Sequence, residues 1–392
     1  MTAPVRILHV HSSFSLGGKE ARAVRLMNAF GDAADHVVLS GVAGALGARD
    51  AIDPPIRVAF PADHPRLTGR PSLARYRELA RFMRGFDLVL TYNWGAMDMV
   101  AAKRLFGGPP LVHHEDGFNE DEAGGQKRAR IAFRRLMLPA ANAVVVPSHM
   151  LERVARGSWR QPAGRVFRIG NGIPVERYAT PPRPDAIPGF RRREGRVTVG
   201  TIAGLRRVKN LGLLIRAVAL ADEGIDLVIV GEGTERDSLM RESIEAGIAR
   251  RVTMPGFLAD PQDYAGLFDI FALSSDSEQQ PISLMESMAA GLPVAATAVG
   301  DIPEMIAPEN APFLVPPGDV AGLAGAIRRL AGDRLLHERI GAANRAKAAS
   351  EYSESRMIDA YRGLYGSVID RPEAFVVGAR ANFSRNPRRA CL

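Results

Sequence analysis

Two glutamates, Glu278 and Glu286, flank the predicted start of a short helix. Pro281 suits the first helical turn because its missing N–H costs nothing there, and Gly291 followed by Pro293 predicts the end of the helix. Glu278 then lies in the loop before the helix, and Glu286 lies about one and a half turns into it. Free N–H groups at a helix start attract phosphate, so this element offers an anion site between two carboxylates. The N–H donors belong to Ile282, Ser283 and Leu284.

Two carboxylates beside a diphosphate would repel it unless they face hydroxyl groups instead. A nucleoside diphosphate sugar carries hydroxyls at both ends, on the ribose and on the sugar, with the diphosphate between them. The pair therefore suits a nucleotide-sugar site. For two glutamates alone, an ordinary surface helix with solvated carboxylates is the competing interpretation.

The residues after Glu278 extend this pattern. Seven residues separate it from Glu286, and Ser-Met-Ala-Ala-Gly-Leu-Pro-Val-Ala-Ala-Thr follows, then Gly-Asp-Ile-Pro-Glu at 300–304. This long run closely resembles the signature of the GT4 family of retaining glycosyltransferases, and the resemblance extends from about Ile7 to Ile369. In that family the first glutamate contacts the transferred sugar and the second contacts the ribose. The resemblance implies these two roles for Glu278 and Glu286.

The resemblance also implies a fold and a reaction. The fold is the α/β GT-B architecture, in which two Rossmann-like doubly wound parallel-sheet domains face each other across a cleft. The first domain takes the acceptor and the second takes the donor, and the sugar keeps its anomeric configuration. We expect domains at 1–175, completed by 353–370 crossing back, and at 197–352, with a linker at 176–196 and a basic tail at 371–392.

Lys209 follows a predicted strand, 197–203, and precedes a predicted helix, 211–220. It matches the family lysine that binds the donor diphosphate. The family's usual arginine five residues earlier is missing, because Gly204 stands there, and either of two neighbouring arginines could supply that charge. A loop after the strand at 252–254 matches the loop that covers the base in the family. These further donor-binding candidates are Arg206, Arg207, Gly256 and Phe257.

A glycine pair, Gly17 and Gly18, follows the first predicted strand at 6–10. Glycines there let a ligand approach the backbone closely. A P-loop is excluded, since Ser13 stands where that motif needs its first glycine and Glu20 stands where it needs Ser or Thr. In the resembled family a Gly-Gly-x-Glu sequence at this place borders the inter-domain cleft.

Two adjacent histidines, His113 and His114, stand at the end of a predicted strand that begins at Pro110. Apolar strands alternate here with helical stretches such as 72–84, which predicts a doubly wound parallel sheet whose ligands gather at the carboxyl ends of its strands. A histidine at this place in the family lies near the donor sugar. His113 aligns better and His114 is the alternative, while a purely structural histidine remains equally open. The other predicted strands are 36–40, 87–92 and 143–147.

The stretch from Gln126 to Leu138 interleaves cations with apolar residues. This pattern predicts a basic amphipathic helix that can lie on an anionic membrane. A solvated helix with an apolar core face is the alternative. The family's frequent use of lipid-linked acceptors favours the membrane. The cations are Lys127, Arg128, Arg130, Arg134 and Arg135.

Composition limits the class of protein. The chain has 392 residues, of which 46% are hydrophobic, so two domains are expected. Its single cysteine, Cys391, and the lack of a long apolar stretch favour a cytoplasmic protein, in peripheral contact with the inner face of the cell membrane. The net charge of +8 favours anionic partners, although no nucleic-acid-binding module is recognised.

These observations predict a retaining glycosyltransferase that uses a UDP- or GDP-sugar donor. The expected acceptor is a hydroxyl of a lipid-linked, glycolipid or polysaccharide molecule in cell-envelope glycan synthesis. No cofactor and no metal are expected, because an Asp-x-Asp metal motif is not found. A nucleotide-sugar epimerase on the same architecture and a non-catalytic scaffold are the alternatives.

Overall fold

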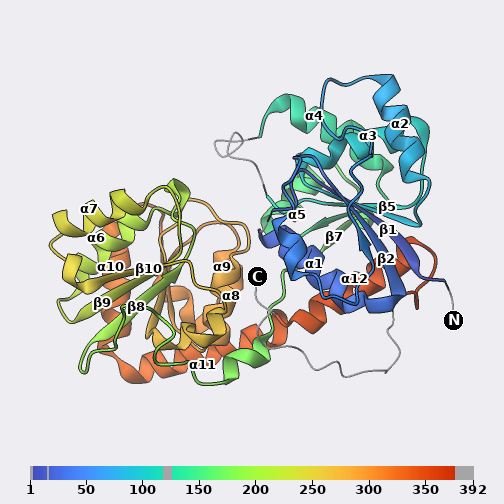
Figure 1. The fold of residues 1–392 in the computed structure, drawn as a ribbon. Coiled ribbons are helices and arrows are strands. Elements are labelled where there is room, and N and C mark those ends of the chain that lie inside the picture. Colours follow the sequence, from blue (N-terminus) through green and yellow to red (C-terminus); the bar gives the residue numbers. More distant parts are fainter. Residues whose placement is uncertain (1–2, 16, 118–125, 376–392) are drawn as a thin grey trace. The chain divides into compact units, whose positions relative to one another are not determined.

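The computed structural model describes residues 3–15, 17–117 and 126–375, and the chain divides into two units. Unit 1 comprises Met1–Gly170 and Met357–Leu392, and unit 2 comprises Asn171–Arg356. Each unit is a parallel sheet with helices on both faces (Figure 1). Most of the predicted basic tail, including Cys391, lies outside the described residues. The prediction of two doubly wound domains is confirmed.

The sheet of unit 1 has seven parallel strands in the order β3-β2-β1-β4-β5-β6-β7. Its inner strands are apolar on both faces, as expected for a parallel sheet that helices cover on both sides. The predicted strands are confirmed to within a few residues. The strands are β1 (Val5–His11), β2 (Ala34–Ser40), β3 (Val58–Ala59), β4 (Leu88–Tyr92), β5 (Leu111–His114), β6 (Ala143–Val146) and β7 (Val166–Arg168).

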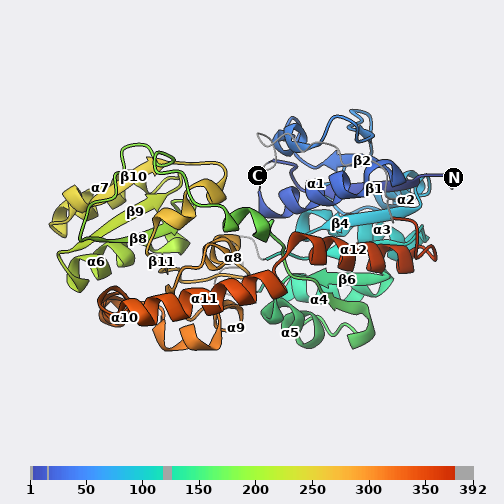
Figure 2. The same ribbon diagram turned by 90° about the horizontal axis from the view of Figure 1, so that it is seen from below.

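Six helices pack on the sheet of unit 1 and form two apolar clusters. One cluster joins the sheet to α2, α3 and α5, and the other joins it to α1 and α12, which returns at the end of the described chain (Figure 2). The Ser72 hydroxyl caps α2 by accepting a hydrogen bond from the Arg75 N–H at 3.3 Å. The helices are α1 (Gly18–Phe30), α2 (Leu73–Met83), α3 (Met97–Phe106), α4 (Arg128–Met137), α5 (His149–Gly157) and α12 (Glu354–Val368).

The sheet of unit 2 has six parallel strands in the order β10-β9-β8-β11-β12-β13. They are β8 (Val197–Ile202), β9 (Ile225–Val230), β10 (Val252–Gly256), β11 (Ile270–Leu273), β12 (Val294–Thr297) and β13 (Leu314–Val315). The helices are α6 (Leu211–Ala221), α7 (Arg236–Glu245), α8 (Ile282–Ala289), α9 (Ile302–Met305), α10 (Val320–Gly332) and α11 (Arg334–Glu351).

The strand order reverses once in each sheet. In unit 1 the chain leaves β1 toward β2 and β3 and then resumes on the other side with β4, so the reversal lies between β1 and β4. In unit 2 the same reversal lies between β8 and β11. Loops on the two sides of a reversal turn away from each other at the carboxyl ends of the strands, which leaves a crevice where ligands of such sheets bind.

The segment expected to be a linker, 176–196, packs against unit 2. Ile187 and Phe190 are buried in its apolar core, with 2% and 7% of their surface exposed. Arg193 and Arg196 both form ion pairs with Asp226 at the start of β9. The prolines and glycines of this segment therefore shape a packed loop, and unit 2 begins at Asn171.

Among the described residues, none of the helices is both long enough and apolar enough to span a bilayer.

Candidate functional site

Lys209 and Glu278 meet at the strand-order reversal of unit 2. Lys209 lies in the loop after β8, and Glu278 lies in the loop after β11. The Lys209 ammonium donates a hydrogen bond to Glu278 Oε1 at 2.5 Å, and the Ser275 hydroxyl donates to the same oxygen at 2.7 Å. Only 8% of the Glu278 surface is exposed. Two residues far apart in sequence thus form a largely buried ion pair at the expected ligand position.

Three hydrogen bonds from backbone and side-chain donors hold these two loops together. The Asp276 N–H donates to the Val208 carbonyl at 2.9 Å, and the Ser274 hydroxyl donates to the Lys209 carbonyl at 3.1 Å. Asn210, in the left-handed conformation with φ of 44°, donates its side-chain amide to Asp276 at 2.9 Å. These three bonds, of which one joins backbone to backbone, hold the loops that carry the lysine and the glutamate next to each other.

Gly300 and Asp301, the Gly-Asp pair of the signature, pack against the backbone of the loop that carries Glu278. Gly300 has a φ of 58°, and a Cβ atom there would overlap the Glu278 carbonyl oxygen. Asp301 donates its N–H to the Gln279 carbonyl at 3.1 Å. Glycine is required at position 300 because the two loops touch backbone to backbone.

Helix α8 begins at Ile282, one residue later than expected, and Pro281 is its N-cap. Glu286 therefore lies about one turn into the helix and is half-buried. The N–H of Leu284 donates to the Pro281 carbonyl at 3.2 Å, so the expectation that Leu284 offers a free donor was wrong. The N–H groups of Ile282 and Ser283 precede any intrahelical acceptor, so they remain the candidate anion donors of this helix.

Gly256 ends β10 beside the end of β9. Its φ is 95°, and its carbonyl accepts a hydrogen bond from the Gly231 N–H at 2.9 Å. Phe257 follows with 68% of its surface exposed. An exposed aromatic ring at the carboxyl edge of the sheet is the kind of group that a planar base could cover.

In unit 1, the two candidate histidines are the last residues of β5 and are buried. His114 is held on both ring nitrogens, by the Thr91 carbonyl at 3.2 Å and the Tyr365 hydroxyl at 2.8 Å, and burial lowers its pKa well below the usual value. His113 contacts the Thr91 hydroxyl at 2.9 Å through Nδ1. Its Nε2 makes no hydrogen bond within the described residues, but it lies 3.5 Å from the Glu115 carboxylate, and the ring is fully buried.

The glycine pair of unit 1 precedes α1 and lies against Glu20. A Cβ atom on Gly17 would come within 2.9 Å of the Glu20 carboxylate, and Gly18 is the first residue of the helix. Glu20 is 3% exposed, pairs with Lys19, and has a pKa raised by burial. The Glu20 carboxylate therefore folds back over the turn at Gly17.

His11, at the end of β1, is a residue that the sequence reading missed. Its ring stacks on Tyr92 with centroids 4.0 Å apart and lies 3.9 Å from Glu20. Neither ring nitrogen has a hydrogen-bond partner among the residues the structure describes. Burial lowers its pKa, so the ring is neutral. The available signal was the His-Val-His sequence at the carboxyl end of the first strand.

The basic helix is shorter than predicted, and one of its cations belongs to the core. Arg134 is fully buried, forms an ion pair with Glu115 at 3.2 Å, and stacks over the rings of Trp94 and Trp159. The expectation that Arg134 lies on a membrane-facing surface was therefore wrong. Lys127, Arg128 and Arg135 are exposed.

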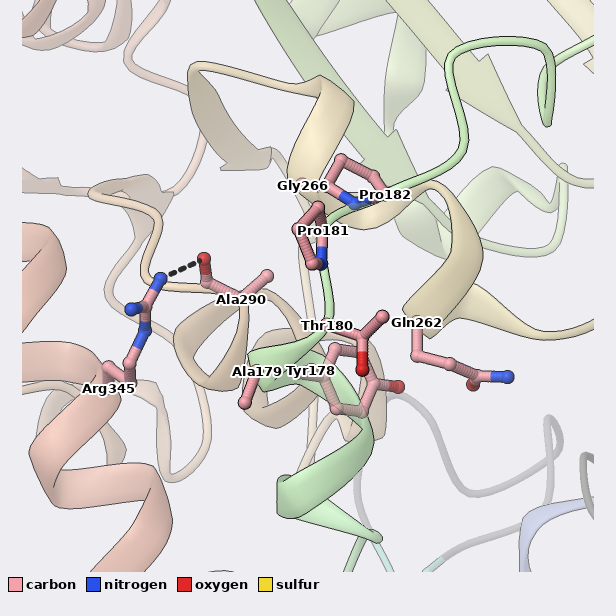
Figure 3. A pocket seen from close by; sticks show the side chains of 9 residues that line it. All are labelled: Tyr178, Ala179, Thr180, Pro181, Pro182, Gln262, Gly266, Ala290 and Arg345. Carbon is pink, nitrogen blue, oxygen red and sulfur yellow. Dashed lines mark hydrogen bonds between the residues drawn. The ribbon is translucent and has the colours of Figure 1, made fainter.

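A pocket of about 280 Å³ lies elsewhere on unit 2, at the opposite end of α8 from Glu278 (Figure 3). Prolines and small residues form most of its wall, including Pro181, Pro182 and Gly266. Its cation, Arg345, donates to the Ala290 carbonyl at 3.0 Å. None of the predicted site residues lines this pocket, so it is separate from the candidate site.

Comparison with known families identifies the class of protein. A model of the family described as glycosyl transferases group 1 matches residues 196–333, and a model of glycosyltransferase family 4 matches residues 16–177. The first match contains Lys209, Glu278 and Glu286. The chain belongs to this family, the group 1 or GT4 glycosyltransferases.

Individual relatives match part of the chain. N-acetyl-alpha-D-glucosaminyl L-malate synthase of Bacillus anthracis is 28% identical over 170 residues, which are 43% of this chain and 45% of that protein. The lipopolysaccharide core biosynthesis glycosyltransferase LpsD of Rhizobium meliloti is 33% identical over 167 residues, 42% of this chain and 48% of that protein. The chain thus matches about half the length of these curated relatives.

Solved structures share the fold over nearly the whole chain. Anabaena HepE in complex with UDP has a TM-score of 0.76 at 22% identity, covering 92% of this chain and 100% of that one. The sucrose-phosphate synthase of Thermosynechococcus elongatus has a TM-score of 0.74 at 20% identity, covering 93% and 99%. The expected fold of two Rossmann-like sheets, which the GT-B glycosyltransferases share, is confirmed.

Proposed function

We propose that the protein transfers a sugar from a nucleoside diphosphate sugar, with UDP or GDP as the carrier, to a hydroxyl of an envelope glycan or glycolipid. The observation that carries this proposal is the contact between Lys209 and Glu278, at 2.5 Å, at the strand-order reversal of unit 2. A lysine placed there, beside the start of α8, suits the diphosphate, and a glutamate can accept hydrogen bonds from the sugar hydroxyls. HepE, which shares the fold, was solved in complex with UDP, and this supports a uridine carrier.

The chemistry follows from where negative charge develops. Cleaving the sugar from the diphosphate leaves charge on the departing phosphate, and donors aimed at that charge lower the barrier most. Lys209 and the N–H groups of Ile282 and Ser283 are such donors. When Lys209 forms an ion pair with the diphosphate, its ion pair with Glu278 is broken. Glu278 can then accept hydrogen bonds from sugar hydroxyls. Glu286, half-buried on α8, is assigned to the ribose.

The reaction needs no metal in this scheme, because Lys209 and the helix start supply the positive potential. Retention of the anomeric configuration is carried over from the family resemblance. On unit 1, the family resemblance assigns His113 to the transferred sugar and assigns Gly17 and Gly18 to the acceptor side. These residues complete the proposed substrate contacts.

The acceptor is proposed to be lipid-linked, glycolipid or polysaccharide, as in a transferase of envelope glycan synthesis. LpsD, a 33% identical relative, acts by its name in lipopolysaccharide core biosynthesis. Residues 126–170 hold ten Lys or Arg and a single acid, Glu152. This cationic stretch, which includes α4 and α5, is proposed to contact an anionic membrane peripherally.

Two substitutions test the assignment. Glu278→Ala and Lys209→Ala should each lower sugar transfer by at least roughly 100-fold, because each removes a group that contacts the reacting part of the donor. The exposed Glu245→Ala on α7 is the matched control and should transfer at the normal rate. The assay follows release of UDP or GDP with and without EDTA. Near-normal turnover in both site variants would refute the assignment, and loss of transfer in EDTA that manganese restores would refute the metal-free scheme.

A further inference from the structure

The loop between β8 and α6 carries three cations, Arg206, Arg207 and Lys209, and one of them is already neutralised. Lys209 forms an ion pair with Glu278 at 2.5 Å. A diphosphate carries more negative charge than one lysine balances, so a second cation near this loop has a clear use. Both arginines are exposed, and sequence alone does not distinguish them.

The structure distinguishes Arg206 from Arg207, because it shows where the Arg206 side chain lies. A Cβ atom built on Gly204 would lie 3.4 Å from the Arg206 Nε and 3.9 Å from the Glu232 carbonyl oxygen. The Arg206 side chain therefore folds back over Gly204, at the carboxyl ends of β8 and β9. Lys209 lies on the other side of β8, toward β11. The two cations flank the end of the strand at which a bound anion is expected.

The backbone on which Arg206 stands is fixed by its packing against the loop after β9. A Cβ atom on Gly231 would overlap the Ala203 carbonyl, and one on Gly233 would overlap the Leu205 carbonyl, so the loops after β8 and β9 pack backbone to backbone. Leu205 also donates its N–H to the Glu232 carbonyl at 2.8 Å. This contact fixes the direction in which the next residue, Arg206, leaves the loop.

The guanidinium of Arg206 is not committed to an acid. Glu232, whose carbonyl lies in the same corner, directs its carboxylate to Arg236 at 3.2 Å. In the part of the chain that the structure describes, the Arg206 side chain makes no hydrogen bond or ion pair. An arginine with a fixed backbone position and five guanidinium N–H groups free of other acceptors is well suited to bind phosphate oxygens.

We infer that Arg206, and not Arg207, is the second cation that binds the donor diphosphate, and that position 204 is glycine so that the Arg206 side chain can lie across it. This inference rests on the proposed function. Gly204 has no backbone need to be glycine, because its φ is outside the left-handed region and only the movable Arg206 side chain limits a Cβ there to 3.4 Å. An arginine at position 204 would therefore reach the same space once Arg206 is shortened.

The test is a relocation of the charge. UDP and GDP are titrated calorimetrically into the wild-type protein and into Arg206→Ala, Arg207→Ala and the double variant Gly204→Arg/Arg206→Ala. Arg206→Ala should weaken binding by roughly 10- to 100-fold, the usual effect of losing a charged hydrogen bond. Arg207→Ala, which removes the same charge from the neighbouring exposed position, should stay within about twofold. The double variant should regain most of the lost affinity.

Three outcomes overturn the inference. If Arg206→Ala and Arg207→Ala bind alike, only the net charge of the loop matters. If Arg207→Ala alone loses affinity, the assignment is reversed. If the wild-type protein binds neither nucleotide, the proposed function fails and this inference fails with it, which separates the two kinds of failure. Melting temperatures equal to that of the wild type show that each variant is folded.

Discussion

At the scale of single residues, the site depends on an ion pair and on glycines that let two loops pack closely. Lys209 and Glu278 form an ion pair. We propose that a bound sugar diphosphate separates them, so that Lys209 contacts the phosphate and Glu278 contacts the sugar. Glycines set the backbone distances around this pair: Gly300 lies against the Glu278 carbonyl, and Gly231 lies against the Ala203 carbonyl. The site therefore needs glycine at these positions as much as it needs its charged side chains, because a Cβ atom would prevent the close backbone contacts.

Gly300→Ala should destabilise the protein by roughly 1–3 kcal/mol and weaken binding of UDP or GDP, because the new Cβ would push Glu278 out of place. Gly318→Ala is a matched control. Gly318 also has a positive φ, 83°, but nothing described lies within 4 Å of the position of its Cβ.

Urea unfolding and nucleotide titration of both variants separate the cost of the backbone angle from the cost of the overlap. A Gly300→Ala protein as stable and as nucleotide-binding as Gly318→Ala would contradict the supporting role of Gly300.

At the scale of elements, the first two strands of unit 1 bury a histidine pair. His9 Nε2 and His36 Nδ1 are 3.0 Å apart, so one ring donates to the other and both are neutral. Burial lowers the pKa of His36 to about 4, and it lowers the pKa of His9 well below the usual value. Protonation of either ring would therefore place a charge in the buried layer between β1 and β2 and the helices that cover them.

The stability of the protein should fall as the pH drops from about 6.5 toward 4. The unfolded chain binds a proton at His36 near the ordinary pKa of 6.5, whereas the folded chain binds it only near 4, so acid favours unfolding. The contribution of His36 is fully present above pH 6.5. Its loss should cost roughly 1–3 kcal/mol by pH 4.

Melting temperature measured against pH tests this expectation. His36→Gln should flatten the acid side of the curve, whereas His64→Gln, in the loop after β3, should leave its slope unchanged. Parallel curves for wild type and His36→Gln would show that another group governs acid stability.

At the scale of the whole molecule, charge is divided unequally. Unit 1 has 30 Lys and Arg against 18 Asp and Glu, a net charge of +12, whereas unit 2 has 21 against 25, a net charge of −4. The excess of +8 for the chain thus arises in unit 1. A unit of this charge is attracted to anionic surfaces, which agrees with its proposed role on the acceptor side.

Vesicles with anionic lipid should bind the protein at low salt, and neutral vesicles should not. Each Lys or Arg near such a surface contributes about 1 kcal/mol, and this attraction is screened as salt rises. Arg128→Glu/Arg156→Glu, on α4 and α5, should weaken flotation with anionic vesicles. Arg250→Glu/Arg334→Glu makes the same change of charge on unit 2 and should have little effect. Equal losses in both pairs would mean that net charge alone acts, without a binding surface on α4 and α5.

Sequence patterns were sufficient wherever the determining interactions are local. Apolar runs predicted the parallel strands because both faces of such strands are buried. The spacing from Glu278 to Glu286, with Pro281 and Gly291, predicted α8 and placed its carboxylates on either side of the helix start. Composition and length predicted two domains, since a chain this long exceeds one typical core.

Only the tertiary structure decided what depends on distant partners. Arg134 has the pattern of an exposed cation, but Glu115, Trp94 and Trp159 bury it, and no local spacing reveals that contact. Segment 176–196 has the composition of a linker, yet it packs on the core of unit 2. Sequence left Arg206 and Arg207 equivalent, whereas the fold places one side chain over Gly204, because the direction of a side chain is set by the backbone packed beneath it.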